Sequence, residues 1–103
     1  MPRRNGFDSI IAESVAKIAS GIEDPEEFSS NILSNHVIES IKKVGMNLRT
    51  TRDGINICYF CQKGPFTKKG YYLHLMRSHY QSLIDLVEQE SERIASISKD
   101  VEF

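Results

Sequence analysis

This chain of 103 residues is organised around residues 58–79, which read CYFCQKGPFTKKGYYLHLMRSH. The stretch holds both cysteines of the chain and two of its three histidines. A Cys-x-x-Cys turn directs two sulfurs at one point, and two histidines five positions apart on a helix lie about 140° apart around its axis. Thiolates and imidazoles at these spacings are the ligand set of a structural Zn²⁺ site. The sequence therefore predicts one zinc ion per chain, held by Cys58, Cys61, His74 and His79.

With these ligands, residues 55–80 resemble a single C2H2 zinc finger, a module built as a ββα unit. The family usually has an aromatic residue four positions after the second cysteine and a leucine three before the first histidine. Here Pro65 and Tyr71 occupy those positions, and Phe66 comes one step late. The resemblance implies a fold in which Phe66 and Tyr71 fill a small core, with a hairpin arm that differs from the family shape.

Composition limits the remaining possibilities. No run approaches the roughly 20 apolar residues of a membrane span, and the polar N-terminus shows no secretory signal. Cysteines committed to a metal indicate a reducing, intracellular compartment, in the cytoplasm or nucleus; a Cys58–Cys61 disulfide is the alternative. A site with four protein ligands leaves no position for a substrate, so we expect neither an enzyme nor a small-molecule substrate.

Charge is distributed unevenly along the chain. The net charge is −1 overall, but residues 1–41 carry −4, residues 42–80 carry +7 and residues 81–103 carry −4. A basic block around a metal site is typical of phosphate contact. The alternative is a solvated basic face without a ligand.

The N-terminal part reads as helices. Ile11, Val15, Ile18 and Ile22 form one apolar stripe, which predicts a helix over 8–20 that ends at Gly21. Asp24-Pro25-Glu26-Glu27 is a helix start signal, and the pattern then continues to Val44, with Gly45 as the stop. Ser34-Asn35 could divide this run into helices over 26–33 and 36–44.

Two β-prone runs, 46–51 and 55–60, flank Arg52-Asp53-Gly54 and predict a β-hairpin. With three helices before it, this hairpin gives residues 8–60 a weaker resemblance to a winged helix-turn-helix. That resemblance implies Lys42 and Lys43 on a recognition helix and Arg49 and Arg52 on the wing.

After the hairpin, the finger helix is expected to continue past His79 to about residue 98, because apolar positions recur every three or four residues. This seam comprises Leu73, Met76, Tyr80, Leu83, Val87, Ile94 and Ile97. Either the N-terminal helices or a second copy of the chain would cover it, the second case giving a homodimer or coiled coil.

These elements define an α+β, mostly helical fold class: N-terminal helices, a β-hairpin, and a ββα finger whose helix extends into a long amphipathic helix. We expect an N-terminal helical segment (1–45), a hairpin and finger (46–80) and a C-terminal helical extension (81–103), joined in one unit or a dimer.

The basic block favours a small transcriptional regulator that binds double-stranded DNA. The finger resemblance places the base-reading positions on Thr67, Gly70 and Leu73. Gly70 has no side chain to read a base and Leu73 offers only an apolar contact, so phosphate contacts should dominate. The candidate nucleic-acid-binding residues are Arg49, Arg52, Lys63, Thr67, Lys68, Lys69 and Arg77. The alternative is a zinc-stapled protein-interaction or dimerisation module; RNA binding also stays open, through Tyr59, Phe60, Tyr71 and Tyr72.

Overall fold

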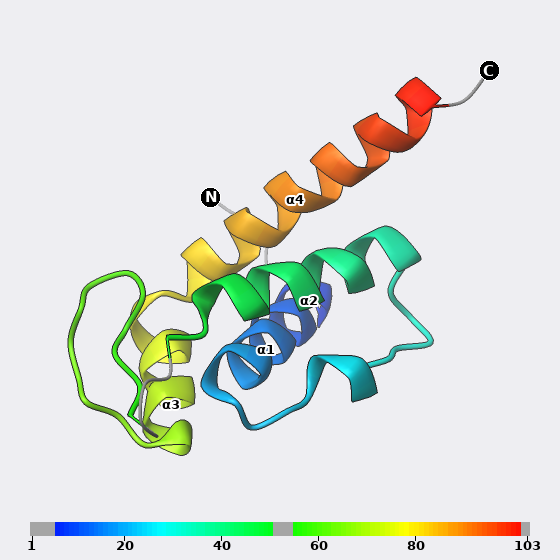
Figure 1. Ribbon diagram of the computed structural model, residues 1–103. Coiled ribbons are helices and arrows are strands. Elements are labelled where there is room, and N and C mark those ends of the chain that lie inside the picture. The colour runs from blue at the N-terminus through cyan, green and yellow to red at the C-terminus, as the bar shows by residue number, and fades with distance from the viewer. Residues whose placement is uncertain (1–5, 51–54, 102–103) are drawn as a thin grey trace.

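The computed structural model describes residues 6–50 and 55–101 and consists of helices packed around a central one (Figure 1). In chain order the elements are α1 (Gly6–Ser20), the 3-10 turn η1 (Pro25–Glu27), α2 (Asn35–Leu48), α3 (Lys68–Ser78) and α4 (Tyr80–Val101). α1 packs against α2, α3 and α4. One cluster of buried side chains draws on all four helices and on Cys58, so the helices and the metal-binding segment share a core.

The expected α+β class is wrong. Within the described ranges there is no β-strand, and the β-structure is limited to isolated bridging such as Asn56 with Phe66. The described residues form neither a hairpin nor a ββα finger, so they also lack the wing that the winged helix-turn-helix resemblance implied. α2 continues to Leu48, through the first half of the expected strand 46–51. The expected turn, Arg52-Asp53-Gly54, lies outside the described residues.

Gly45 explains why α2 does not stop where the sequence suggested. Gly45 is a helical residue on the side of α2 that faces α1, where a Cβ atom would lie 2.6 Å from Cγ2 of Ile18. Its missing side chain therefore permits a close helix crossing rather than a helix end. The expected helix over 8–20 is confirmed as α1, which Gly21 ends at φ +88°.

The helix expected to run from residue 26 to Val44 is only partly present. Only Pro25–Glu27 is helical, as η1, and α2 begins after Ser34, whose hydroxyl accepts a hydrogen bond from the Val37 amide (3.3 Å). The hydroxyl of Ser30 likewise accepts from the amide of Ile32. Serine side chains that bond to nearby backbone compete with helix formation, which explains the break that Ser34-Asn35 suggested.

The apolar seam is largely covered within the chain. Leu83 and Val87 are fully buried against α1 and α2, and Met76 and Tyr80 are partly buried on the same core. Leu73 instead lies on the outer side of α3. Ile94 is half-buried, and the side chain of Ile97 lies outside the described part. A dimer through α4 stays a prediction, and it now concerns the end of the helix that projects past α2 (Figure 1).

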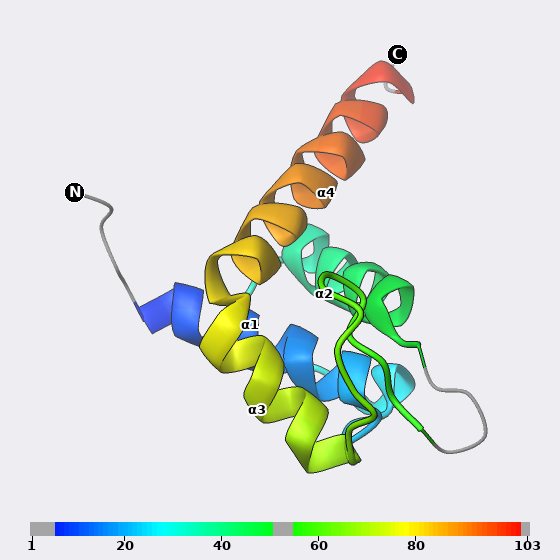
Figure 2. The same cartoon turned by 90° about the vertical axis from the view of Figure 1, so that its left-hand side faces the viewer.

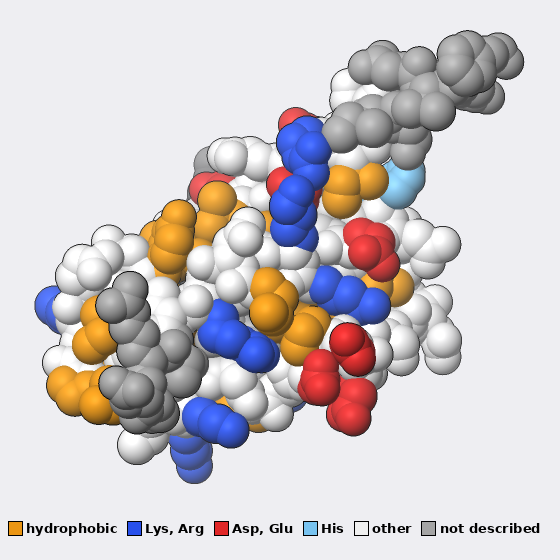
Figure 3. All heavy atoms as spheres, viewed as in Figure 1, with side chains coloured by type: hydrophobic (Ala, Val, Ile, Leu, Met, Phe, Trp, Pro, Cys, Tyr) orange, Lys and Arg blue, Asp and Glu red, His pale blue; other side chains and the backbone are white. Residues whose placement is uncertain are grey.

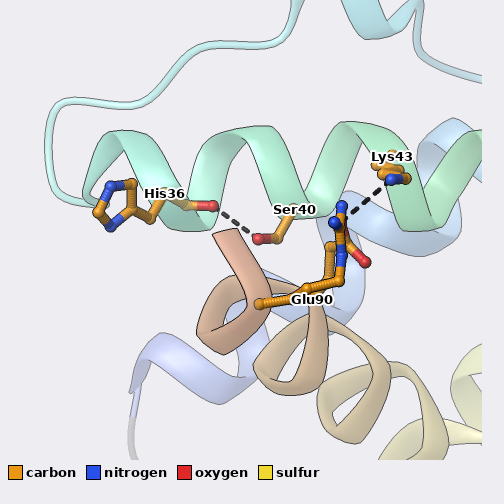
Figure 4. Close-up of polar contacts among 5 residues, drawn as sticks. His36, Ser40, Lys43 and Glu90 are labelled. Carbon is orange, nitrogen blue, oxygen red and sulfur yellow. Dashed lines mark hydrogen bonds and ion pairs between the residues drawn. The ribbon is translucent and has the colours of Figure 1, made fainter. Parts of the chain in front are cut away.

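Glu90 lies between Val87 and Ile94 in the apolar seam and joins α4 to α2 through an ion pair. Its Oε2 atom lies 3.3 Å from Nζ of Lys43 (Figure 4). The same oxygen also pairs with Arg93, one turn further along α4. Those cations, Arg93 first, hold the pKa of the Glu90 carboxyl below its usual range. Nearby on α2, the buried hydroxyl of Ser40 donates to the carbonyl of His36.

The expected uninterrupted helix over 68–98 is also wrong. α3 ends at Ser78, His79 leaves helical geometry at φ −132° and ψ 25°, and α4 starts at Tyr80 in a new direction (Figure 2). A straight helix would keep His74 and His79 about 140° apart and more than one turn apart along the axis. The break brings the second imidazole back to the first.

Among the described residues, no helix is both long enough and apolar enough to cross a bilayer.

Replacing Gly45 with alanine should destabilise the fold, because the new methyl group would overlap Ile18 at the crossing of α1 and α2. We expect a loss of about 1–3 kcal/mol in the free energy of unfolding, measured by urea denaturation. Met46→Ala, at the neighbouring exposed position, is the control and should change stability by less than about 0.5 kcal/mol. Equal effects of the two substitutions would contradict a close crossing at Gly45.

Candidate metal centre and basic surface

Four potential metal ligands come together where the loop over 55–66 meets the junction of α3 and α4. Cys58 and Cys61 lie on the loop, His74 on α3, and His79 at the residue that joins the two helices. Their sulfur and nitrogen ligand atoms all lie within 4.8 Å of one another. The structure thus brings together all four residues of the predicted ligand set, close enough to bind one metal ion.

The loop holds the two sulfurs through its own backbone. The Cys58 amide donates to the carbonyl of Lys63 (2.8 Å), and the Gln62 amide donates to the carbonyl of Cys58 (3.0 Å). Gln62 takes a positive φ of 65°, which closes the turn. Gly64 has φ +146°, and a Cβ there would lie 2.9 Å from the Asn56 carbonyl oxygen, so only glycine fits this return of the loop.

Each imidazole is held by an aromatic ring. The ring of Phe66 stacks on His74 and the ring of Phe60 stacks on His79, both with centroids 4.7 Å apart. The two imidazoles meet edge to face at 5.1 Å. The aromatic residues thereby fix the orientation of the rings in addition to shielding the site from one side each.

The protonation states of the site fit a cation. Burial raises the pKa of the Cys58 thiol and lowers the pKa of the His79 imidazole. The imidazole is therefore held in the neutral form that binds metals, whereas the thiolate needs a positive charge beside it. The Nε2 atom of His79 is buried without a hydrogen-bond partner among the described residues. A metal ion would supply both the missing partner and the charge.

Tyr71 connects this centre to the helical body. Its side chain is fully buried on α3; its hydroxyl donates to the carbonyl of Leu48 at the end of α2 (2.8 Å) and accepts the amide of Tyr59 between the two cysteines (3.2 Å). Burial raises the pKa of this hydroxyl. On the other side of α3, the hydroxyl of Tyr72 donates to Glu13 of α1 (3.3 Å).

The predicted nucleic-acid-binding residues divide into two groups. Lys63, Lys68, Lys69 and Arg77 are exposed on the loop and α3, and none of them forms an ion pair with a described residue. From Ile55 to His79 the sequence contains these four cations and no acidic residue. We refer to these four residues together as the basic surface of the metal-binding segment.

The other predicted nucleic-acid-binding residues are Arg49, Thr67 and Arg52, and the first two have structural roles. The guanidinium of Arg49 donates to the carbonyl of Ile18 (2.8 Å from Nη2) and so satisfies the C-terminal end of α1. Thr67 is the N-cap of α3, where its hydroxyl accepts the Gly70 amide (3.0 Å). Arg52 lies outside the described residues. Figure 3 shows that lysine and arginine side chains on the visible face are spread out and do not merge into one patch.

The sequence interpretation missed the stacking of Phe60 and Phe66 on the ligand imidazoles and the bridging hydroxyl of Tyr71. A partial signal was present, since both phenylalanines lie within five residues of a cysteine. The partners of Tyr71 gave no signal, because Leu48 is 23 residues away along the chain.

Comparisons with protein-family models, curated proteins and solved structures gave no match for this chain. Any resemblance to C2H2 fingers therefore depends on the ligand residues and their spacing.

The four-residue centre predicts that the chain binds one divalent ion and that each ligand is required. Co²⁺ binding can be measured through the visible absorption of a tetrahedral thiolate complex, and we expect it to saturate at one ion per chain. Cys58→Ser and His79→Ala should each lower the affinity for the ion by more than about a hundredfold. His36→Ala removes the third histidine, which is exposed on α2, and should titrate like the wild type. Full-affinity binding by His79→Ala would exclude this centre.

Tyr71→Phe removes only the hydroxyl and leaves the Leu48 carbonyl and the Tyr59 amide without that partner. We expect it to lower the free energy of unfolding by about 1–3 kcal/mol. Tyr72→Phe removes a hydroxyl at a partly exposed position of the same helix and should cost less than about 0.5 kcal/mol in the same denaturation experiment. A similar, small effect of both would show that the Tyr71 bridge contributes little.

Proposed function

We propose that the metal ion is Zn²⁺ and that the zinc-bound segment binds double-stranded DNA, as part of a small transcriptional regulator. Two cysteines and two histidines are a closed, structural zinc set. In tetrahedral zinc, sulfur and nitrogen ligands lie roughly 3.5 Å apart, and the Cys61 sulfur lies 3.4 Å from Nε2 of His74. All four ligand atoms lie within 4.8 Å of one another.

The observation that carries the DNA proposal is the basic surface on residues 55–79. Lys68, Lys69 and Arg77 are exposed on α3 and Lys63 is exposed on the loop, and none of the four forms an ion pair with a described residue. Such a surface suits contacts to phosphates, which supply most non-specific affinity.

Sequence selectivity should be low. Gly70, Leu73 and Arg77 line a shallow hollow of about 340 Å³ on the outer side of α3. Gly70 has no side chain, Leu73 offers only an apolar contact, and the hydroxyl of Thr67 already caps the helix. Phosphate contacts position a protein without reading bases, so we propose weakly selective binding to duplex DNA.

The alternative function, a zinc-stapled protein-interaction module, is favoured by a separate groove beside Tyr59. That groove shares no lining residue with the basic surface, so the two functions are compatible.

The DNA proposal predicts a specific change in salt dependence. We would measure the anisotropy of a labelled random-sequence duplex against zinc-loaded protein over a salt series, for the wild type and for the triple variant Lys68→Gln, Lys69→Gln, Arg77→Gln. If the three residues contact three phosphates, the slope of log K against log salt should fall by about 2.7.

The matched control is Lys17→Gln, Lys42→Gln, Lys43→Gln, which removes the same charge from α1 and α2. It should keep the wild-type slope. If the slope falls equally in both triple variants, binding depends on net charge alone and not on the basic surface. If the wild type does not bind duplex DNA at low salt, the DNA proposal is refuted.

A further inference from the structure

A groove lies where the end of α2, the metal-binding loop and α4 meet. Its volume is about 380 Å³. Val44 and Leu48 of α2 and Leu86 of α4 supply the apolar lining, and Tyr59 forms a wall with 49% of its surface exposed. Figure 3 shows hydrophobic side chains at the surface in this region. Val44 and Leu48 are almost completely buried and form the floor of the groove, so Tyr59 and the partly buried Leu86 supply its open apolar surface. A half-exposed aromatic side chain beside such a groove is typical of an interaction site.

Two cations and one carboxylate meet at one side of the groove. Glu90 and Arg93 line it, and Lys43 lies next to them: Oε2 of Glu90 pairs with Arg93 and also with Lys43, the second pair being drawn in Figure 4. The side chains of Lys43 and Arg93 are 51% and 49% exposed. Two half-exposed cations thus share a single carboxylate, which leaves one positive charge for a ligand to neutralise.

The polar groups of the rim distinguish between kinds of partner. Asn47 and Gln89 each offer one acceptor and two donors, the combination that a peptide backbone requires. The lining has one aromatic ring among aliphatic side chains, whereas single-stranded nucleic acid is bound on successive aromatic rings.

We propose that this groove binds a segment of a partner protein in which an apolar side chain is adjacent to an acidic one. The apolar side chain would lie between Tyr59 and Leu86, and the carboxylate would pair with Arg93 and Lys43. The backbone of the segment would bond to Asn47 and Gln89. Charge complementarity at a partly desolvated rim would set the preference for acidic segments.

The metal centre also shapes this groove. Tyr59 lies between the ligands Cys58 and Cys61, and its amide bonds to the hydroxyl of Tyr71. Loss of the metal ion would release the turn that places this wall. Binding of the partner segment should therefore require the metal-loaded protein.

Two synthetic peptides test the proposal in the full-length, zinc-loaded protein: acetyl-Ser-Asp-Leu-Phe-Glu-Ser-amide and its neutral counterpart with Asn and Gln in place of Asp and Glu. Binding is followed by changes in ¹⁵N-resolved amide shifts. We expect the acidic peptide to shift the amides of Tyr59, Leu86 and Arg93, with an affinity at least about threefold higher than the neutral one.

Matched variants separate this proposal from the DNA proposal. Arg93→Gln should weaken the acidic peptide by about threefold to tenfold and leave duplex binding unchanged, whereas Arg77→Gln should do the reverse. Tyr59→Ser, at a half-exposed position, should also weaken the peptide while the helical circular dichroism is retained.

The groove proposal is overturned if the peptides cause no localised shifts, if both bind equally, or if Arg93→Gln binds the acidic peptide like the wild type. It is also overturned if a single-stranded oligonucleotide binds this groove more tightly than the acidic peptide does. None of these results depends on whether duplex DNA binds at α3.

Discussion

The arrangement of this molecule depends on one buried hydroxyl, that of Tyr71. It joins the end of α2, the metal-binding loop and α3 through two hydrogen bonds. In a finger built on a hairpin, strand pairing would place the cysteines against the helix. Here that pairing is reduced to bridging around Asn56 and Phe66. The Tyr71 bridge and the packing of Cys58 into the common core therefore take over the task of placing the cysteines, and they couple the metal centre to the stability of the helices.

The second constraint is that His79 serves both as a ligand and as a corner. Because the backbone leaves the helix at this residue, α4 departs from the direction of α3. This new direction lets Leu83 and Val87 pack on α1 and α2. A straight helix would carry the same apolar stripe away from those helices. The geometry that brings the two imidazoles together is thus also the geometry that buries the first half of α4.

Short-range patterns in the sequence were informative where the residues themselves determine the outcome. Cysteine and histidine are rare in this chain, so their spacing identified the ligand cluster, and the three-four periodicity identified α1 and the apolar side of α4. Features decided by distant residues could not be predicted. Gly45 reads locally as a helix stop, yet Ile18 requires a glycine there for close packing. Arg49 reads as a phosphate contact, yet the carbonyl it binds is 31 residues away. The residues from Met46 to Leu48 favour a strand locally, yet they belong to α2 because packing against distant residues outweighs local propensity.

The charge pattern gains a physical meaning from this fold. The segments before residue 42 and after residue 80 each carry −4, and the metal-binding stretch 55–79 carries four cations and no acid. A polyanion approaching the molecule would be repelled by the acidic segments and attracted to α3 and its loop, so the field favours the orientation that the proposed DNA contact requires. The rim of the groove differs, because Glu90 already offsets one of its two cations. That rim presents one net charge to a ligand and the basic surface presents four. A peptide carboxylate matches the first and a row of phosphates matches the second, so electrostatics alone would direct the two proposed partners to different surfaces.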